Sequence, residues 1–328
     1  MLEKTLPRKG DVTERVAGRV ARNRIRIAWM YYVEGLTQSE IADRLGIGRV
    51  TVIRNINEAI RQREVKIWIE GDVAECLELE AQLKVAFNLR DAVVIPEPSL
   101  AANTTKAIGV AAGMYITDTL TDDMTVGLGW GATLYESLQT LAPRELENVQ
   151  VISLLGGIVQ ARRYNPSEFA WQVARMVGAD CYLLTAPVVV DSPETRETLI
   201  EKCGLRDVLR RAERLDMAVL SCGTMAPDST AFRFDLLSDE DRTALIRLGA
   251  VGDILFNFFN RDGRLVDHPI NKRVMSIPIE QLRDVPKRMI ASGGNEKVDT
   301  LLGAIKLIDC NVLITNEATA RELLIRRT

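Results

Sequence analysis

Residues Leu36–Ile60 read LTQSEIADRLGIGRVTVIRNINEAI and carry the signals of two short helices joined by a tight turn. Thr37 is an N-cap candidate and Glu40 stands three residues later, which is the capping-box pattern that starts a helix. Gly46 follows the last turn of that helix, and glycine adopts the left-handed conformation of a sharp reversal at little cost. A second helix is therefore predicted from about Arg49. The residues predicted to face the core are Ile41, Ala42, Leu45, Val52, Ile53 and Ile56.

Polar and cationic side chains occupy the outer face of the second predicted helix. They are Arg49, Thr51, Arg54 and Asn55. When the N-terminal half of such a helix enters the major groove, its side chains reach phosphates and base edges. Thr37 and Gln38, at the start of the preceding helix, are predicted to contact the same DNA. A three-helix structural or dimerisation module would share the apolar pattern, but the capping box, the glycine turn and the cationic helix together favour double-stranded DNA as the partner.

The charge of the chain is unevenly distributed, in agreement with this assignment. Residues 1–70 carry fourteen Lys and Arg against nine Asp and Glu, or +5, so the remainder carries −8 of the total charge of −3. The basic end is the candidate for meeting phosphate. A solvated helix face would give the same excess, so the prediction depends on the motif.

The five cysteines are scattered and show no C-x-x-C spacing, so neither a disulfide framework nor a metal site is predicted. The first residues lack the apolar core of a signal peptide. No stretch approaches the roughly 18 apolar residues that a membrane span needs. We therefore expect a cytoplasmic protein that does not contact a membrane.

From Arg90 onward, short apolar runs alternate with amphipathic helical stretches. This alternation is typical of a parallel sheet covered by helices on both faces. The apolar runs are DAVVIP, MTVGLG, VQVISLL, CYLLTAP, MAVLSC, AVGDILF, RMIASG and CNVLIT. The predicted fold class is α/β, with a doubly wound and mostly parallel sheet.

Three regions are expected along the chain. Residues 1–64 would form the three-helix domain, and residues 90–328 the larger α/β domain that binds a ligand and oligomerises. Residues 65–89 would link them, because VKIWIEG (Val65–Gly71) alternates as a strand does and Asp72–Asn88 has a helical pattern.

Several predicted strands of the larger domain end in small or polar residues. Among these are Gly129, Gly156, Gly157, Gly223 and Asp253. Ligands of open α/β sheets bind outside the carboxyl ends of the strands, so these loops are expected to converge on one crevice. A helix follows Gly129 directly, and the free N–H groups of a helix start favour a phosphate or a polyol oxygen. Glycines that merely let loops turn are the competing interpretation.

A loose dinucleotide fingerprint is present at Gly127-x-Gly129-x-x-Ala132. The next strand, which ends in LLGG, lacks the acidic residue expected roughly 20 positions further on for the ribose. No nicotinamide cofactor, and no other cofactor, is therefore predicted.

The segment YYVEGLTQSEIADRLGIGRVTV (Tyr31–Val52) resembles the DNA-binding region of SorC-type sugar-responsive transcriptional regulators. The resemblance covers nearly the whole chain, because further segments resemble that family's effector domain in order. They are VGLGWGATLYESLQTL, VISLLGGI, TAPVVVDSPETRETLI, AVLSCGTM, LGAVGDILFNFFNRDGRLVDHPIN, ASGGNEKVDTLLGAI and NVLITNEATARELL. One departure is Gly48-Arg49-Val50, where the family usually has Ser or a similar cap, then Arg and often Pro, so the operator sequence cannot be carried over.

The resemblance implies a regulator of a carbohydrate or polyol utilisation operon, with an effector domain similar to sugar-phosphate isomerases. Its operator binding would be controlled by a sugar, a polyol or a sugar phosphate. The residues implied to cradle this effector are Gly129, Trp130, Gly131, Ala132 and Thr133. Asp253 would bind hydroxyls and Lys297 an anionic end, although Lys297 would equally suit a solvent-exposed surface. Trp130 would stack on a sugar face or simply fill the crevice.

The competing functional class is a sugar-phosphate-processing, isomerase-like enzyme with an accessory N-terminal domain. Asp228, Asp253 and Glu296 are the candidate bases, but none stands in a recognisable catalytic motif, so no catalytic residue is assigned. The single histidine, His268, is expected to be a turn or interface residue. Because symmetric dimers usually bind operators, a homodimer or homotetramer is expected.

Overall fold

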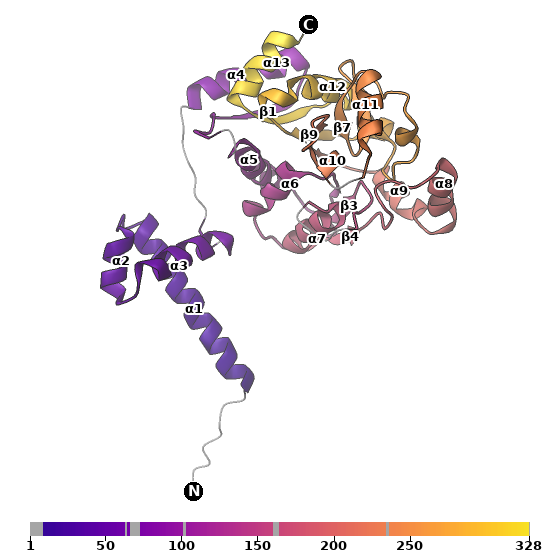
Figure 1. Cartoon of the computed structure of the whole chain (residues 1–328). Helices are drawn as coiled ribbons and strands as arrows, with labels where there is room; N and C mark the ends of the chain where they lie inside the picture. The colour runs from indigo at the N-terminus through magenta and orange to yellow at the C-terminus, as the bar shows by residue number, and fades with distance from the viewer. Residues whose placement is uncertain are drawn as a thin grey trace. The chain divides into compact units, whose positions relative to one another are not determined.

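The computed structural model describes residues 9–62, 64–65, 73–100, 103–159, 164–233 and 236–327. The chain divides into two compact units, Met1–Ile69 and Glu70–Thr328, which are described separately (Figure 1). The predicted linker strand Val65–Gly71 lies outside the described residues except for Val65. Among the described helices, none combines the length and the apolar character that a membrane crossing requires.

The described part of the first unit contains three helices, α1 (Lys9–Tyr32), α2 (Gln38–Leu45) and α3 (Arg49–Arg61). All three contribute to one small hydrophobic core. Its buried members are Ile27, Met30, Ile41, Ala42, Val52 and Ile56. The predicted three-helix unit is thus confirmed, with Ile53 only half-buried.

The turn between α2 and α3 has the predicted caps. The Thr37 amide donates to Glu40 Oε2 at 2.7 Å, and the Glu40 amide donates to Thr37 Oγ1 at 3.3 Å. Gly46 closes α2 in the left-handed conformation, with φ of 64°. The capping box and the glycine turn therefore orient α2 and α3 as the sequence predicts.

The second unit is built on a seven-stranded sheet in the order β1-β10-β9-β5-β2-β3-β4, in which every pair is parallel. The strands are β1 (Asp91–Ile95), β2 (Thr125–Leu128), β3 (Gln150–Ser153), β4 (Asp180–Tyr182), β5 (Met217–Leu220), β9 (Lys287–Ala291) and β10 (Val312–Asn316). This confirms the doubly wound, mostly parallel prediction.

Two hydrophobic cores lie on opposite faces of this sheet. On one face pack α5 (Thr104–Thr119), α6 (Ala132–Glu136) and α7 (Pro166–Val177), and on the other α4 (Val73–Phe87), α12 (Val298–Ile308) and α13 (Glu317–Arg326). Alternate residues of one strand enter different cores: Met217 of β5 enters the first, and Ala218 the second. Because both faces are buried, the strands read as continuous apolar runs.

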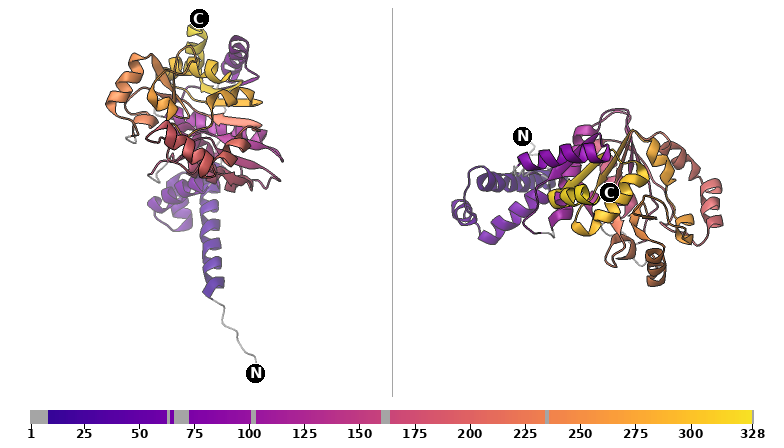
Figure 2. Two further views of the ribbon diagram at one scale, coloured as in Figure 1. Left: turned by 90° about the vertical axis from the view of Figure 1, so that its right-hand side faces the viewer. Right: turned by 90° about the horizontal axis from the view of Figure 1, so that it is seen from above.

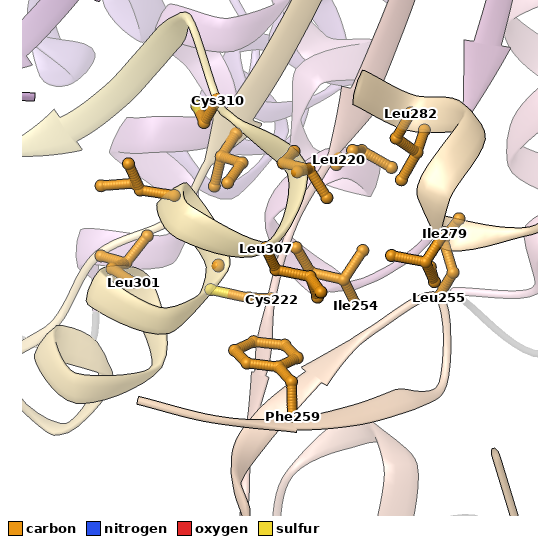
Figure 3. Close-up of a cluster of buried hydrophobic side chains, with 14 of the residues drawn as sticks. Leu220, Cys222, Ile254, Leu255, Phe259, Ile279, Leu282, Leu301, Leu307 and Cys310 are labelled. Carbon is orange, nitrogen blue, oxygen red and sulfur yellow. The ribbon is translucent and has the colours of Figure 1, made fainter. Parts of the chain in front are cut away.

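One predicted strand lies elsewhere. The run AVGDILF forms β7 (Ala250–Ile254) of a separate antiparallel sheet, with β6 (Gly223–Thr224) and β8 (Asn257–Asn260) as its neighbours. Leu255 and Phe256 have positive φ, so the chain reverses at once into β8. Figure 3 shows Phe259 of β8 beneath α12, close to Cys222 and Ile254. The apolar run alone does not distinguish the two sheets.

Helix α4, which was expected in the linker, belongs to the second unit. Leu79 and Leu83 are buried against the sheet, and the Val94 amide of β1 donates to Glu80 Oε1 at 2.9 Å. Figures 1 and 2 show α4 beside α13, far from α8 (Pro193–Lys202) and α9 (Arg206–Ala212). The remaining helices are α10 (Thr230–Arg233) and α11 (Asp239–Arg247).

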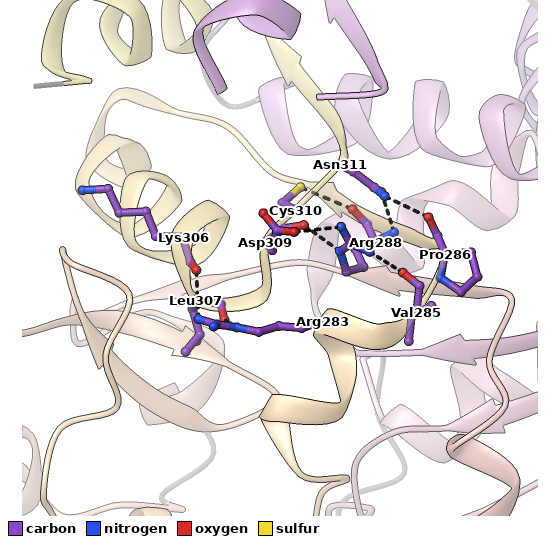
Figure 4. A network of polar contacts seen from close by, with 9 residues as sticks. All are labelled: Arg283, Val285, Pro286, Arg288, Lys306, Leu307, Asp309, Cys310 and Asn311. Atoms are coloured by element: carbon purple, nitrogen blue, oxygen red, sulfur yellow. Dashed lines mark hydrogen bonds and ion pairs between the residues drawn. The ribbon is translucent and has the colours of Figure 1, made fainter. Parts of the chain in front are cut away.

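Two arginines close the C-terminal end of α12 (Figure 4). Arg283 Nε donates to the Leu307 carbonyl at 2.9 Å, and Arg288 Nε donates to the Asp309 carbonyl at 2.6 Å. Asp309 itself is left-handed, with φ of 52°. Cations on the last carbonyls of a helix favour its dipole, so this network stabilises the end of α12.

Candidate functional sites

The candidate DNA-binding surface is the outer side of α3 with the start of α2. Arg49 and Arg54 are exposed, as predicted, and Arg49 Nε donates to Gln38 Oε1 at 3.4 Å. Among the described residues, no hydrogen bond or ion pair engages the Arg54 guanidinium. This surface therefore presents an uncompensated positive charge, the property that a phosphate backbone requires.

Three further predicted DNA-binding residues are engaged within the protein. Thr51 and Asn55 are half-buried, and Asn55 Nδ2 donates to the Thr51 carbonyl at 2.8 Å. The hydroxyl of Thr37 donates to Glu40, and this hydrogen bond lowers the pKa of the Glu40 carboxyl. These side chains keep some hydrogen-bonding capacity, and their contact with DNA remains a prediction.

The structure exposes two residues of α3 that the sequence analysis did not select, Val50 and Asn57. They lie on the same stripe as Arg54, at intervals of four and three residues, opposite the buried Val52 and Ile56. This spacing is visible in the sequence.

The candidate effector site lies where the strand order of the sheet reverses. From β2 the chain proceeds outward to β3 and β4, then returns to β5 on the other side of β2. Such a switch point opens a crevice at the carboxyl ends of the two central strands. Gly131, which follows β2, lies there beside Ser221, which follows β5: a Cβ built on Gly131 would stand 3.8 Å from Ser221 Cβ.

The loop after β2 holds five of the predicted effector residues, Gly129 to Thr133. The Gly129 amide donates to the Val219 carbonyl of β5 at 2.9 Å, which ties the loop to the neighbouring strand. Trp130 is only 5% exposed and packs on Phe256 with ring centroids 6.1 Å apart. Of the two interpretations of Trp130, the structure favours the one in which the indole fills the wall of the crevice.

Asp253 is a buried carboxylate beside the predicted Gly223. The two residues are paired between β6 and β7, and a Cβ on Gly223 would stand 2.3 Å from Asp253 Oδ1. The Phe256 amide donates to Asp253 Oδ2 at 3.0 Å. Burial raises the pKa of Asp253 to about 6, against the opposing effects of this hydrogen bond and of Lys297. The carboxylate is therefore poorly solvated and is suited to accept hydrogen bonds from ligand hydroxyls.

Lys297 is half-buried at the N-cap of α12, where the helix dipole disfavours a cation. Gly294 has φ of 110° in the turn before it, and its amide donates to Thr319 Oγ1 at 2.8 Å. Within the described part of the chain, no hydrogen bond or ion pair engages the Lys297 ammonium. Burial raises the pKa of both Asp253 and Cys222, and the charge of Lys297 opposes this rise in both, so Lys297 lies near both. An anionic ligand group would balance this charge.

Gly156 and Gly157 have structural partners. The Gly156 amide donates to the Met275 carbonyl and the Gly157 amide to the Ala186 carbonyl, both at 2.8 Å. A Cβ on Gly156 would approach the Ala186 carbonyl oxygen to 2.6 Å. Gly156 is therefore required for close packing, whereas a Cβ on Gly157 would meet nothing closer than Ser167 Oγ at 3.3 Å. Contact of either glycine with an effector remains a prediction.

Two hollows of the second unit lie away from this crevice. One, of about 320 Å³, lies at the amino ends of β1, β9 and β10 beside Arg90 and Arg288. The other, of about 330 Å³, lies beside Glu280 and Arg283. Arg283 and Arg288 both donate to backbone carbonyls (Figure 4), so neither guanidinium is free to bind a ligand in these hollows.

The three carboxylates considered as catalytic bases differ in their exposure to solvent. Asp228 and Glu296 are exposed, whereas Asp253 is buried. His268 Nδ1 accepts a hydrogen bond from the Ile270 amide at 3.3 Å, in keeping with the predicted turn. In the described ranges, no three His, Cys, Asp or Glu side chains are placed to hold a metal ion.

Comparison with known proteins places this chain among regulators. The family described as putative sugar-binding domain matches residues 71–325. The erythritol catabolism regulatory protein EryD of Brucella abortus is 28% identical over 303 residues, covering 92% of this chain and 95% of the relative. The transcriptional regulator LsrR of Escherichia coli O9:H4 is 30% identical over 305 residues, covering 91% and 93%.

A solved structure supports the same grouping. The full-length sorbitol operon regulator SorC from Klebsiella pneumoniae matches with a TM-score of 0.73 and 28% identity, over 93% of this chain and 98% of that one. The match extends over both units of the chain.

Proposed function

The chain belongs to the family of sugar-binding transcriptional regulators, and from this premise we propose that α3 binds operator DNA and that an effector at the β2–β5 switch point controls this binding. The observation that supports the effector site most is the burial of Asp253, which is paired with Gly223 shortly after β5, near Lys297, which has no partner among the described residues. The relatives are named as regulators, which favours this function over an isomerase-like enzyme.

For the DNA half of the proposal, Arg49 and Arg54 supply the main contacts. Both are exposed, and Arg54 has no partner among the described residues. Thr37, Gln38, Thr51 and Asn55 add hydrogen bonds to the phosphate backbone or to base edges at the same helix ends. A symmetric operator is bound by a homodimer or by a homotetramer built from two dimers. The proposed place of action is the bacterial cytoplasm, where the operator lies.

For the effector half, the ligand is a sugar, a polyol or a sugar phosphate. The loop Gly129–Thr133 and Gly223 form the walls: Gly131 has a positive φ of 126°, and a Cβ on Gly223 would stand 2.3 Å from Asp253 Oδ1. Asp253 accepts hydrogen bonds from hydroxyl groups, and Lys297 binds an anionic or strongly polar end. The effector shifts the equilibrium between DNA-binding and non-binding arrangements by the difference between its affinities for the two.

Thermal unfolding of the full-length protein tests the effector site. The panel contains free sugars, polyols including erythritol and sorbitol, and sugar phosphates. A native-state ligand at about 100 times its Kd adds roughly 2.7 kcal/mol of stability, which is a clear rise in unfolding temperature. The proposed effector is the compound whose stabilisation is lost in Lys297→Gln and Asp253→Asn.

Matched control variants distinguish the loss of a charge at the proposed site from the loss of a charge on the exposed surface. Lys306→Gln removes an exposed lysine of the same helix α12, and Asp262→Asn removes an exposed aspartate. Both are expected to keep the stabilisation. If a stabilising compound acts equally on all four variants, the switch-point site is wrong, and if no compound of the three classes acts, the proposed ligand class is wrong.

A further inference from the structure

Val50 is an exposed apolar side chain on a helix whose other side is well buried. It is 79% exposed, whereas Val52 and Ile56 of the same helix are 0% and 5% exposed. A β-branched side chain in water contributes nothing to the core and slightly disfavours the helix. The folding of the first unit therefore gives no reason for valine at this position.

The neighbours of Val50 indicate what covers it. The exposed stripe of α3 runs from Val50 through Arg54 and Asn57 to Arg61. Arg61 is paired with Glu58, but Arg54 has no partner among the described residues, and Arg49 is exposed beside Val50. An apolar side chain set among free cations matches the major groove of DNA, where phosphates flank an apolar group on one base.

We propose that Val50 contacts the C5-methyl group of a thymine and so makes thymine a required base in each operator half-site. The inference rests on the proposed operator binding by α3. Thymine alone among the four bases presents a methyl group in the major groove. Arg54 lies one helical turn after Val50, about 5.4 Å to 6 Å along the axis, and base pairs are stacked about 3.4 Å apart. The thymine therefore lies within about two base pairs of the position that Arg54 contacts.

The test begins with duplexes selected from a random library by the full-length protein. Each thymine of the selected duplex is then replaced by deoxyuridine, which removes only the methyl group. For the unaltered protein, one thymine in each half-site is expected to be sensitive. Replacing one such thymine should weaken binding about fourfold, the effect of losing one buried methyl group. The Val50→Ala variant is expected to bind the thymine duplex more weakly and to be insensitive to that same replacement.

Val85→Ala is the matched control, because Val85 is 86% exposed on α4 of the other unit. It should keep the full sensitivity to deoxyuridine, and Val50→Ala should keep the unfolding temperature. Binding that is insensitive to every deoxyuridine, or that is equally sensitive in Val50→Ala, overturns the thymine contact and leaves operator binding intact. A library from which no sequence is enriched overturns both proposals.

Discussion

The two units of this chain differ in how many separate segments form the recognition surface proposed for each. The proposed DNA-binding surface lies on one helix, between Arg49 and Arg61, together with the start of α2, where Gln38 accepts from Arg49. The proposed effector crevice combines the loops after β2 and β5 with Asp253 of β7 and Lys297 before α12. The first surface is local in sequence, whereas the second exists only when distant segments meet.

This difference has a physical consequence. Helical periodicity and caps act over three or four residues, so they orient Arg54 whatever the rest of the chain does. The position of Lys297 relative to Asp253 depends on sheet order, on the turn at Gly294 and on the packing of α12. Changes in the first unit are therefore expected to affect its stability and DNA binding but not effector affinity, and changes near the crevice to affect the stability of the second unit and effector affinity.

The largest effect is expected from Ile41→Ala in α2. Ile41 is fully buried in a core that has only a few other members, so the loss of its side chain leaves a cavity worth roughly 3–4 kcal/mol. Operator binding measured by fluorescence anisotropy should be lost, while effector-induced stabilisation of the second unit persists. Val33→Ala, at a 60% exposed position, is the control. Loss of both activities in Ile41→Ala would show that the units are not independent.

A somewhat smaller change in the free energy of unfolding is expected from Asp253→Asn, and this change is stabilising rather than destabilising. Burial raises the folded-state pKa of Asp253 to about 6 from its ordinary value of 3.8, so the folded state keeps this proton after the unfolded state has lost it. The contribution of Asp253 to stability therefore falls as pH rises from about 4 to 6, and the variant should be more stable at pH 7 by about 2–3 kcal/mol.

Urea unfolding of both proteins between pH 4 and pH 8 checks this prediction. The stability difference should be small near pH 4, grow up to about pH 6 and then stay constant. Effector affinity at pH 7 should fall at the same time in Asp253→Asn. A difference that does not depend on pH would contradict the burial of this charge.

A third comparison uses one glycine from each unit. A Cβ on Gly252 of β7 would stand 2.2 Å from the Gly223 carbonyl oxygen, whereas a Cβ on Gly48 would meet only Thr51 Oγ1 at 4.0 Å. Gly252→Ala is expected to cost roughly 2 kcal/mol and to weaken effector binding, because β6 must move. Gly48→Ala should leave effector binding unchanged. Equal effector affinity in both variants would mean that the β6–β7 approach does not shape the crevice.

The smallest effect is expected at the capping box. Thr37→Ala removes the oxygen that accepts from the Glu40 amide and should destabilise the first unit by about 1 kcal/mol. Thr37→Ser keeps that oxygen and should restore most of the loss, as measured by the ellipticity change of the first unit. If serine were as poor as alanine at this position, the methyl group rather than the cap would matter.

Local features of the fold followed directly from sequence patterns. Thr37 with Glu40, and Gly46 with its positive φ, were predicted and confirmed because caps and left-handed turns depend on neighbouring residues. The parallel sheet was predicted from continuous apolar runs. The membership of AVGDILF in the second sheet was not, because a buried strand reads the same in either partner arrangement.

The functional residues divide in the same way. The sequence by itself determined that a cationic helix follows a glycine turn, and that strands of the larger unit end in glycines. Only the tertiary structure decided that the amides of Gly156 and Gly157 donate to carbonyls, and that Lys297 lies near the buried Asp253. The reason is that helix signals act over a few residues, whereas the partner of a loop amide or of a buried charge is set by the order of the strands.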